Sequence, residues 1–249
     1  MSNCVIGEEV KNLLTKYLNN FLDRFLGLRI QPSAERRLAS VRGEIIRKTG
    51  VSLVYDVGAN KGQWAKAIRK EGYDHELISF EPSDAYVSLK KLAARDREWT
   101  CENLALSNVE GEVNLFSASN ENLSTSILEP LEILNQGFEI DFLSGKKALA
   151  TTLDLYRGEK ERRKFYLKLD VQGAEALVLE GAKSSLKECV AIEFESSLLR
   201  LYRGESSHYD LAMYLISQNF SPVQIVITHW DRDLHTVSMD SIFVKADLL

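Results

Sequence analysis

Two short apolar segments each carry a carboxylate at a position where a ligand could be held. Asp56 lies within SLVYDVG (52–58), and Glu81 directly follows ELISF (76–80). Glu81 stands about 20 residues beyond the glycine that ends the first segment, a spacing at which a carboxylate can accept both hydroxyls of a ribose. The two acids therefore indicate a site for a nucleoside-type ligand.

The first segment runs directly into a glycine pair. Gly58 and Gly62 lack a Cβ, so the backbone can approach a ligand closely, and amides at the start of a following helix point to the same space. The spacing is G-x-x-x-G, without the third glycine of the dinucleotide fingerprint and without the GK[ST] of a phosphate loop. The pair alone is equally consistent with a tight turn that binds nothing. Together with Glu81, it indicates a cofactor without pyrophosphate. S-adenosylmethionine fits, with Asp56 near its positive amino-acid end.

A third segment, FYLKLDV (165–171), carries a lysine and an acid on one face. Lys168 and Asp170 are two residues apart, so they share one face of a strand. A lysine inside a parallel sheet is costly unless it is paired or lies near a site, and Asp170 is its natural partner. Two interpretations remain open, a structural ion-pair cluster that includes Lys168 and Glu175, and a functional group at the end of the strand.

These residues belong to short apolar runs that alternate with helical periodicity from residue 51 to residue 195. Continuous apolar runs are typical of strands buried on both faces of a parallel sheet. The alternation predicts an α/β fold with a mostly parallel sheet. The expected helices are 8–28, 34–48, 63–70, 83–95 (capped by Ser83), 174–181 and 208–218, and the expected strands are 52–58, 76–80, 99–106, 112–117, 165–171, 189–195, 220–228 and 238–245.

Length and composition limit the remaining possibilities. The 249 residues fit one domain at 51–249 with a helical N-terminal extension at 1–50 better than two equal domains. The apolar stripe on 8–28 predicts packing on the body of the protein or on a second subunit of a homodimer, rather than on a membrane. The net charge of −5 argues against a nucleic-acid partner. Three scattered cysteines and no apolar run of ~20 residues predict a cytoplasmic chain without a transmembrane segment.

Six sequence motifs together resemble a known family. They are DVGANKG (56–62), SFEP (79–82), STS (124–126), TTLD (151–154), KLDVQGAE (168–175) and IEFE…LYRG (192–204). Their order and content resemble the FkbM-type S-adenosylmethionine-dependent methyltransferases over residues 51–245. KLDVQGAE together with SFEP carries most of this resemblance.

The resemblance implies a class I methyltransferase fold, a Rossmann-like seven-stranded sheet with strand order 3-2-1-4-5-7-6. It also implies that the glycine-rich turn lines the methionine part of the cofactor, that Glu81 holds the ribose, and that residues 102–107 lie against the adenine. The predicted cofactor-binding residues are Asp56, Gly58, Ala59, Asn60, Gly62, Glu81, Pro82, Ala105, Leu106 and Asp170.

The implied strand order also places Glu193 and Glu195 beside Lys168 and Asp170. A sugar hydroxyl is a poor nucleophile, so a base must take its proton as the methyl group is transferred. Asp170 is the first candidate for this base, Glu195 the second, and His229, at the end of an apolar strand, the third. Asp170 with Glu193 or Glu195 could bind Mg²⁺, but no spacing requires it, and no metal is predicted.

Members of this family typically methylate hydroxyls of sugars or of sugar-bearing natural products, so the expected acceptor is a sugar or glycan. The polar stretch 117–137 is either a mobile surface loop or a substrate lid, and the STS motif favours the lid. We predict acceptor contacts from Ser124, Thr125, Ser126 and Lys168. The alternatives are N-methylation of a nucleic acid or protein, against which the acidic charge and the absence of an NPPY-like motif argue, and a non-catalytic cofactor-binding module, which intact motifs disfavour.

Overall fold

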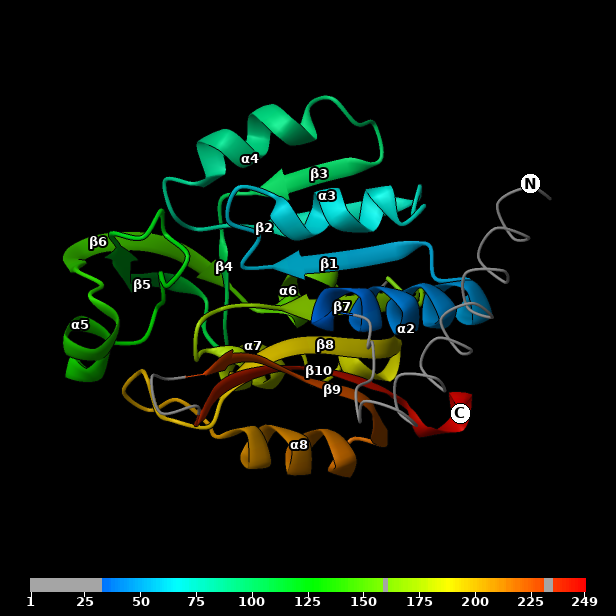
Figure 1. Ribbon diagram of the computed structural model, residues 1–249. Coiled ribbons are helices and arrows are strands. Elements are labelled where there is room, and N and C mark those ends of the chain that lie inside the picture. Colours follow the sequence, from blue (N-terminus) through cyan, green and yellow to red (C-terminus); the bar gives the residue numbers. More distant parts are fainter. Residues whose placement is uncertain (1–32, 159–160, 231–234) are drawn as a thin grey trace, which may run out of the picture. The chain divides into compact units, whose positions relative to one another are not determined.

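The computed structural model of the protein describes residues 33–158, 161–230 and 235–249 (Figure 1). The strands of its main sheet are β1 (Leu53–Val57), β2 (Glu76–Phe80), β3 (Trp99–Glu102), β7 (Phe165–Leu169), β8 (Cys189–Ser197), β9 (Phe220–Trp230) and β10 (Thr236–Lys245). The helices are α2 (Ala34–Thr49), α3 (Gln63–Lys70), α4 (Tyr86–Ala93), α5 (Glu132–Phe138), α6 (Leu153–Arg157), α7 (Glu175–Glu180) and α8 (His208–Ser217), with short 3₁₀ turns η1 (Ser185–Lys187) and η2 (Ala246–Leu248).

The seven strands are ordered β3-β2-β1-β7-β8-β10-β9. β1, β2, β3, β7 and β8 pair in parallel, whereas β10 is antiparallel to both β8 and β9. Counting only the strands of this sheet along the chain, the order is 3-2-1-4-5-7-6. The predicted class I methyltransferase fold is therefore confirmed.

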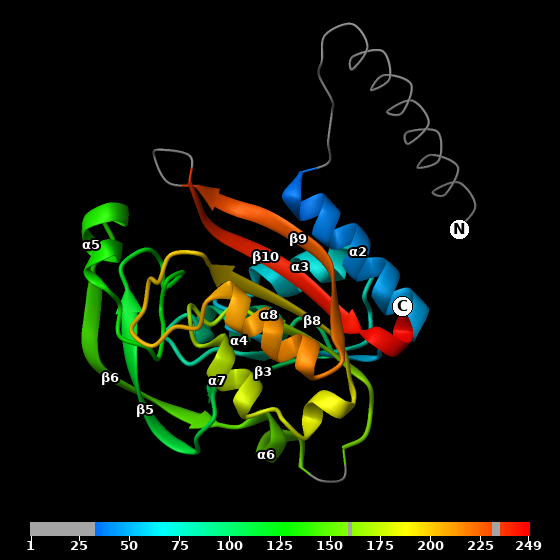
Figure 2. The ribbon, with the colours of Figure 1, turned by 90° about the horizontal axis from the view of Figure 1, so that it is seen from below.

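The central strands are mostly apolar because both faces of the sheet are covered. Every residue of β1 and β7 is buried. Helices α2 and α3 lie over one face of the sheet and α7 and α8 over the other, as the two views show (Figures 1 and 2). A strand enclosed in this way favours apolar residues on both faces, which explains why these strands read as apolar runs, and Asp56 in β1 and Lys168 in β7 are the buried charged exceptions.

A second, three-stranded sheet differs from the sequence prediction. It consists of β4 (Ala105–Leu106), β5 (Gly111–Ala118) and β6 (Phe142–Thr151), in the order β4-β6-β5. The single strand predicted at 99–106 is wrong, because β3 and β4 belong to different sheets. Between the predicted strands 112–117 and 165–171, where no helix or strand was expected, the chain forms α5, β6 and α6. Most side chains of β6 are exposed, so the strand has no apolar pattern by which it could be recognised.

One helix start differs from the prediction. Ser83 does not cap α4, which begins at Tyr86; its hydroxyl instead accepts the Ala85 N–H at 3.2 Å in the preceding turn. α8 begins at His208 as predicted, and Ser207 caps it through a capping box with Asp210.

Residues 38–249 form one compact unit. This unit begins at Leu38, inside the segment that the sequence assigned to the N-terminal extension. The amphipathic helix predicted at 8–28, with its homodimer contact, lies outside the described residues, as do residues 231–234 between the last two strands. In the described part of the chain no helix is long and apolar enough to cross a membrane.

Candidate active site

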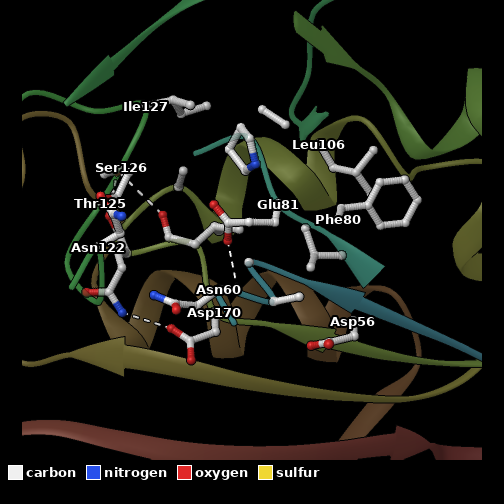
Figure 3. A pocket seen from close by; sticks show the side chains of 18 of the residues that line it. Asp56, Asn60, Phe80, Glu81, Leu106, Asn122, Thr125, Ser126, Ile127 and Asp170 are labelled. Atoms are coloured by element: carbon white, nitrogen blue, oxygen red, sulfur yellow. Dashed lines mark hydrogen bonds between the residues drawn. The ribbon is translucent and has the colours of Figure 1, made fainter. Parts of the chain in front are cut away.

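A pocket lies at the carboxyl ends of β1, β2 and β7, the edge where sheets of this type bind ligands (Figure 3). Apolar side chains that include Phe80, Leu104 and Ile127 form part of its wall. All predicted cofactor-binding residues except Gly62 line it: Asp56, Gly58, Ala59, Asn60, Glu81, Pro82, Ala105, Leu106 and Asp170.

Gly58 allows two strand ends to approach closely. A Cβ built on Gly58, whose φ is +80°, would lie 1.8 Å from the backbone oxygen of Asp170. No other residue fits this turn, and the ends of β1 and β7 are therefore in backbone contact below the pocket.

Gly62 is the one predicted cofactor-binding residue that lies outside the lining of this pocket. A Cβ at this position would lie 2.9 Å from the Trp99 ring and 3.1 Å from the Leu89 side chain. Its φ of +84° also marks a left-handed position immediately before α3. The glycine is therefore required for packing the start of α3 against α4 and β3.

Glu81 is buried at the end of β2 and is held by two backbone amides. Its Oε2 accepts the Asn60 N–H at 2.7 Å and its Oε1 accepts the Ser83 N–H at 2.8 Å. Burial raises the pKa of this carboxyl, and the two amide hydrogen bonds oppose that rise. A carboxylate oxygen can accept more than one hydrogen bond, so each oxygen retains capacity for a ligand hydroxyl. Figure 3 shows Asn60 between Glu81 and Asp170.

Asp56 lines the first pocket, but its carboxylate is almost completely enclosed by protein. Its side chain is buried and its Oδ2 accepts the Ser79 hydroxyl at 2.9 Å, while the same hydroxyl oxygen accepts the Trp99 indole N–H at 3.0 Å. Burial raises the pKa of Asp56 to about 7, and the Ser79 hydrogen bond and the Lys168 charge offset only part of that rise.

A second pocket adjoins the first and shares Leu123, Asp170 and Gln172 with it. Four carboxylates face this second pocket, and among the described residues that line it there is no lysine or arginine. The predicted residues Ser124, Glu195 and His229 also line it. The acidic residues are Asp170, Glu175, Glu195 and Glu205.

Hydrogen bonds hold the loop that carries the STS motif in the walls of both pockets. The Ser126 hydroxyl donates to the Gln172 carbonyl at 2.8 Å, and the Tyr202 hydroxyl donates to the Ser124 carbonyl at 2.8 Å. The Thr125 hydroxyl accepts the Ala118 N–H at 3.0 Å. Thr125 and Ser126 line the first pocket and Ser124 the second. Two of the three hydroxyls predicted to contact the acceptor are thus engaged with the backbone.

Charged side chains lie next to one another on β7 and β8, the fourth and fifth strands of the sheet, as expected. Lys168 and Glu193 are register partners, and the Lys168 Nζ lies 3.9 Å from the Asp170 Oδ2. Burial alone would lower the pKa of Lys168, but the charges of Asp170 and Asp240 raise it above its ordinary value. The buried ammonium is therefore a fixed positive charge beside the shared edge of the two pockets.

The acidity of Glu195 is altered by burial and by neighbouring charges. Burial, followed by repulsion from Asp170 and Asp240, raises its pKa to about 8. A carboxyl with this pKa exchanges a proton near neutral pH, which suits a general base.

His229 lies on β9, and its Nδ1 is 2.9 Å from the Ser238 hydroxyl. The Ser238 hydroxyl is also 3.1 Å from that of Thr228. The histidine lines the second pocket with Asp170 and Glu195, so the structure brings the three predicted base candidates together around one space.

Glu193 lies beside Lys168 as predicted, but it does not line the space that the three base candidates share. Its two oxygens accept the Arg42 Nε and Nη2 hydrogens, each at 2.8 Å, and the Tyr166 hydroxyl and the Trp64 indole N–H donate to it at 2.7 Å and 3.1 Å. Burial would raise the pKa of Glu193, but Arg42 lowers it to about 2. Because each oxygen already accepts two hydrogen bonds, Glu193 is committed to this structural contact. In the described ranges no group of three or more His, Cys, Asp or Glu side chains is arranged to hold a metal.

Sequence reasoning missed several residues of these pockets. Gln172 and Tyr202 lie within the quoted motifs KLDVQGAE and LYRG, but neither carries a charge and neither was assigned a role. Trp64 lines the first pocket and donates to Glu193 at 3.1 Å, and no sequence pattern marks it.

Comparison with solved structures gives matches of low identity. A magnesium protoporphyrin IX methyltransferase from Synechocystis, solved with bound SAM, is 10% identical, with a TM-score of 0.47 and coverage of 93% of this chain and 96% of that chain. An rRNA methylase from Streptococcus thermophilus is 11% identical, with a TM-score of 0.47 and coverage of 87% and 98%. No curated protein matches the sequence.

The family comparison covers most of the region in which the motifs lie. The family described as "Methyltransferase FkbM domain" matches residues 56–222, which is more than half of the chain. The match begins at Asp56, at the end of β1, and continues into β9, so it contains the whole lining of the first pocket and that of the second except His229, Val237 and Ser238. The resemblance seen in the motifs is confirmed, and the chain belongs to the FkbM methyltransferase family.

Proposed function

We propose that this methyltransferase takes its methyl group from S-adenosylmethionine and transfers it to a hydroxyl of a sugar, glycan or glycosylated natural product. The observation that carries the proposal is the junction of the two pockets at Asp170 and Gln172. One pocket suits a nucleoside with an amino-acid tail, and the other suits a polar acceptor. The two share one wall, as direct transfer requires.

The first pocket has groups suited to each part of the cofactor. Glu81 has free acceptor capacity for the ribose hydroxyls, and Ala105 and Leu106 provide an apolar surface for the adenine. The turn from Gly58 to Asn60 and the Asp170 carboxylate lie where the positively charged methionine part would fit. When bound, S-adenosylmethionine supplies an electrophilic methyl group, and the chain has to hold the acceptor oxygen in line with it.

The second pocket favours an acceptor without negative charge. Among the described residues that line it there are four acidic side chains and no lysine or arginine to neutralise the phosphate backbone that a nucleic-acid acceptor would bring with it. Carboxylates are good acceptors for sugar hydroxyls, and Asp170, Glu195 and His229 offer three groups that can take the proton of a reacting hydroxyl. The acidic lining thus supports a neutral polyol over a nucleic acid.

Cofactor binding is tested by calorimetry with S-adenosylhomocysteine. The wild-type protein should bind it, and Glu81→Ala should weaken binding by about 10- to 100-fold because charge-assisted hydrogen bonds to the ribose are lost. Glu112→Ala, at an exposed position on β5, is the matched control and should leave the affinity unchanged. Absence of binding by the wild-type protein, or equal affinity in Glu81→Ala, would reject the cofactor assignment.

Acceptor chemistry is tested with a panel of neutral glycosides, uronic acids and amines, analysed by mass spectrometry for a methyl adduct. The proposal expects O-methylated neutral glycosides. Asp170→Asn should lose about 10²- to 10⁴-fold in turnover if Asp170 is the base, a larger loss than the one in cofactor affinity that follows from removing a carboxylate beside the methionine part. Methylation of amines alone would overturn the proposed acceptor class, and full turnover by Asp170→Asn would transfer the role of base to Glu195 or His229.

A further inference from the structure

Gln172 occupies the wall between the two pockets and lines both of them. It follows β7 in the turn before α7 and has a φ of +54°, a left-handed conformation that a residue with a side chain rarely adopts. Backbone held in such a region is stabilised by its surroundings, and it is concentrated at functional sites. Here its carbonyl accepts the Ser126 hydroxyl at 2.8 Å, which ties the turn to the STS loop.

The side-chain amide of Gln172 is shared between two carboxylates. Its Nε2 donates to the Asp170 Oδ1 at 2.8 Å and to the Glu195 Oε2 at 3.1 Å. A primary amide nitrogen has two hydrogens, so one group can serve both acceptors at once. The first of these contacts comes from the strand that ends at the cofactor pocket, and the second from the strand that forms the acceptor pocket.

The two hydrogen bonds of this amide are important because both acceptors are acidic groups that lie close together. Asp170 and Glu195 repel each other, and Lys168, 3.9 Å from the Asp170 Oδ2, compensates only part of their charge. Hydrogen bonds to an ionised carboxylate favour its charged form. The charged groups that act on Glu195 are Asp170 and Lys168 from β7, Asp240 from β10 and Glu175 from α7.

We propose that Gln172 is a positioning residue of the acceptor site. By donating to both Asp170 and Glu195, it holds the two carboxyl groups in a fixed relative orientation in which they can accept a proton from the acceptor. This inference rests on the proposed function, because it assigns these carboxylates to proton removal. It gives Gln172, the one uncharged polar residue of KLDVQGAE, a role that its residue type alone does not indicate.

The test compares Gln172→Met, which has similar length but no donor, with the wild-type protein. Carboxyl titration of ¹³C-labelled protein with S-adenosylhomocysteine should show the Glu195 midpoint moving to higher pH by about one unit, because one charge-assisted hydrogen bond is lost. With an accepted sugar, kcat at pH 7 should fall at least about 10-fold while cofactor affinity changes less than about 3-fold.

Two further variants keep the inference testable. Gln172→Asn tolerates left-handed backbone but is too short to reach both carboxylates, so it should move the midpoint in the same direction even if Gln172→Met is unstable. Gln63→Met removes a glutamine that lines only the first pocket and should not move it. An unchanged Glu195 midpoint in both Gln172 variants would overturn the inference. The titration needs no acceptor, so it gives its answer even if no sugar is methylated and the proposed function fails.

Discussion

Gly58 controls how closely β1 and β7 can approach each other beneath the pocket. Because a Cβ on Gly58 would lie 1.8 Å from the Asp170 carbonyl oxygen, Gly58→Ala must displace one of the two strand ends. We expect a loss of at least about 2 kcal/mol in stability and a cofactor affinity reduced by 10-fold or more. Calorimetry and thermal unfolding measure both effects.

Gly72→Ala is the matched control for this substitution. Gly72 also has a positive φ, of +99°, but a Cβ there would meet no atom within 4 Å. It should therefore lose stability through backbone strain and keep its cofactor affinity. Equal affinity losses in the two variants would show that the contact with Asp170 is not the cause.

Glu195 sets the expected pH dependence. Burial and the neighbouring Asp170 and Asp240 raise its pKa to about 8, so at pH 6 the carboxyl is protonated and at pH 9 it is ionised. If its ionised form takes part in proton removal, kcat/KM rises with pH and levels off above about 8. Initial rates with a neutral glycoside measure this profile. A flat profile from pH 6 to 9 would exclude Glu195, and Glu195→Gln should abolish the rising limb.

Individual residues differ in how far the sequence could predict their place. Glu81 and Asp170 end apolar strands within recognisable motifs, and both face the cofactor pocket. Gly62 looked like a second ligand-facing glycine, although what it accommodates is the side chain of Trp99. Spacing cannot distinguish a glycine needed for a ligand from one needed for packing, because both lack the same Cβ.

At the scale of elements, α2 is attached to the sheet through Arg42. Its guanidinium binds Glu193 on β8 and also Glu71, at 2.7 Å, just after α3. Arg42→Met leaves the buried Glu193 carboxylate without its partner, so we expect a loss of about 3–5 kcal/mol at pH 7. Urea unfolding measures it.

An exposed ion pair provides the control for this loss. Arg203 and Glu129 lie 2.6 Å apart on the surface, and Arg203→Met should cost at most about 1 kcal/mol. The Arg42 effect should also depend on pH. Folding lowers the pKa of Glu193 from 4.5 to about 2, so its contribution is full above pH 4.5 and disappears as pH falls toward 2. A loss near 1 kcal/mol for both variants would contradict the structural role of Arg42.

Elements were predictable where burial leaves a pattern. The strands β1, β2 and β7 are enclosed on both faces and read as apolar runs. Helix α3 begins at Gln63 and ends at Lys70, as predicted. β6 is exposed along most of its length, so pairing with β5 holds it in place without an apolar signal. The ion pair between Glu193 and Arg42 could not be predicted from the sequence either. Arg42 is 151 residues away in sequence, on a helix assigned to the extension.

At the scale of the whole molecule, charge and site agree on the kind of acceptor. The chain carries a net charge of −5, and the second pocket has four acidic side chains and, in its described lining, no lysine or arginine. The overall charge would slow the approach of a polyanion, and the described lining of the pocket has no lysine or arginine to bind its phosphates. A neutral acceptor meets neither obstacle, and this is the physical reason to place a glycan before a nucleic acid.

The place where the catalytic unit begins can be decided with two fragments. Residues 33–249 retain all of α2, whereas residues 51–249 lack it and leave Glu193 buried without Arg42. An unpaired buried charge costs about 3–5 kcal/mol, and about 2–4 °C in melting temperature accompanies each kcal/mol at this chain length. We therefore expect the shorter fragment to melt at least about 6 °C below the longer one. Because Trp64 donates to Glu193 and lines the first pocket, the shorter fragment should also bind S-adenosylhomocysteine more weakly. Equal melting temperatures and equal affinities would instead place the start of the unit at residue 51 and leave α2 as an addition to it.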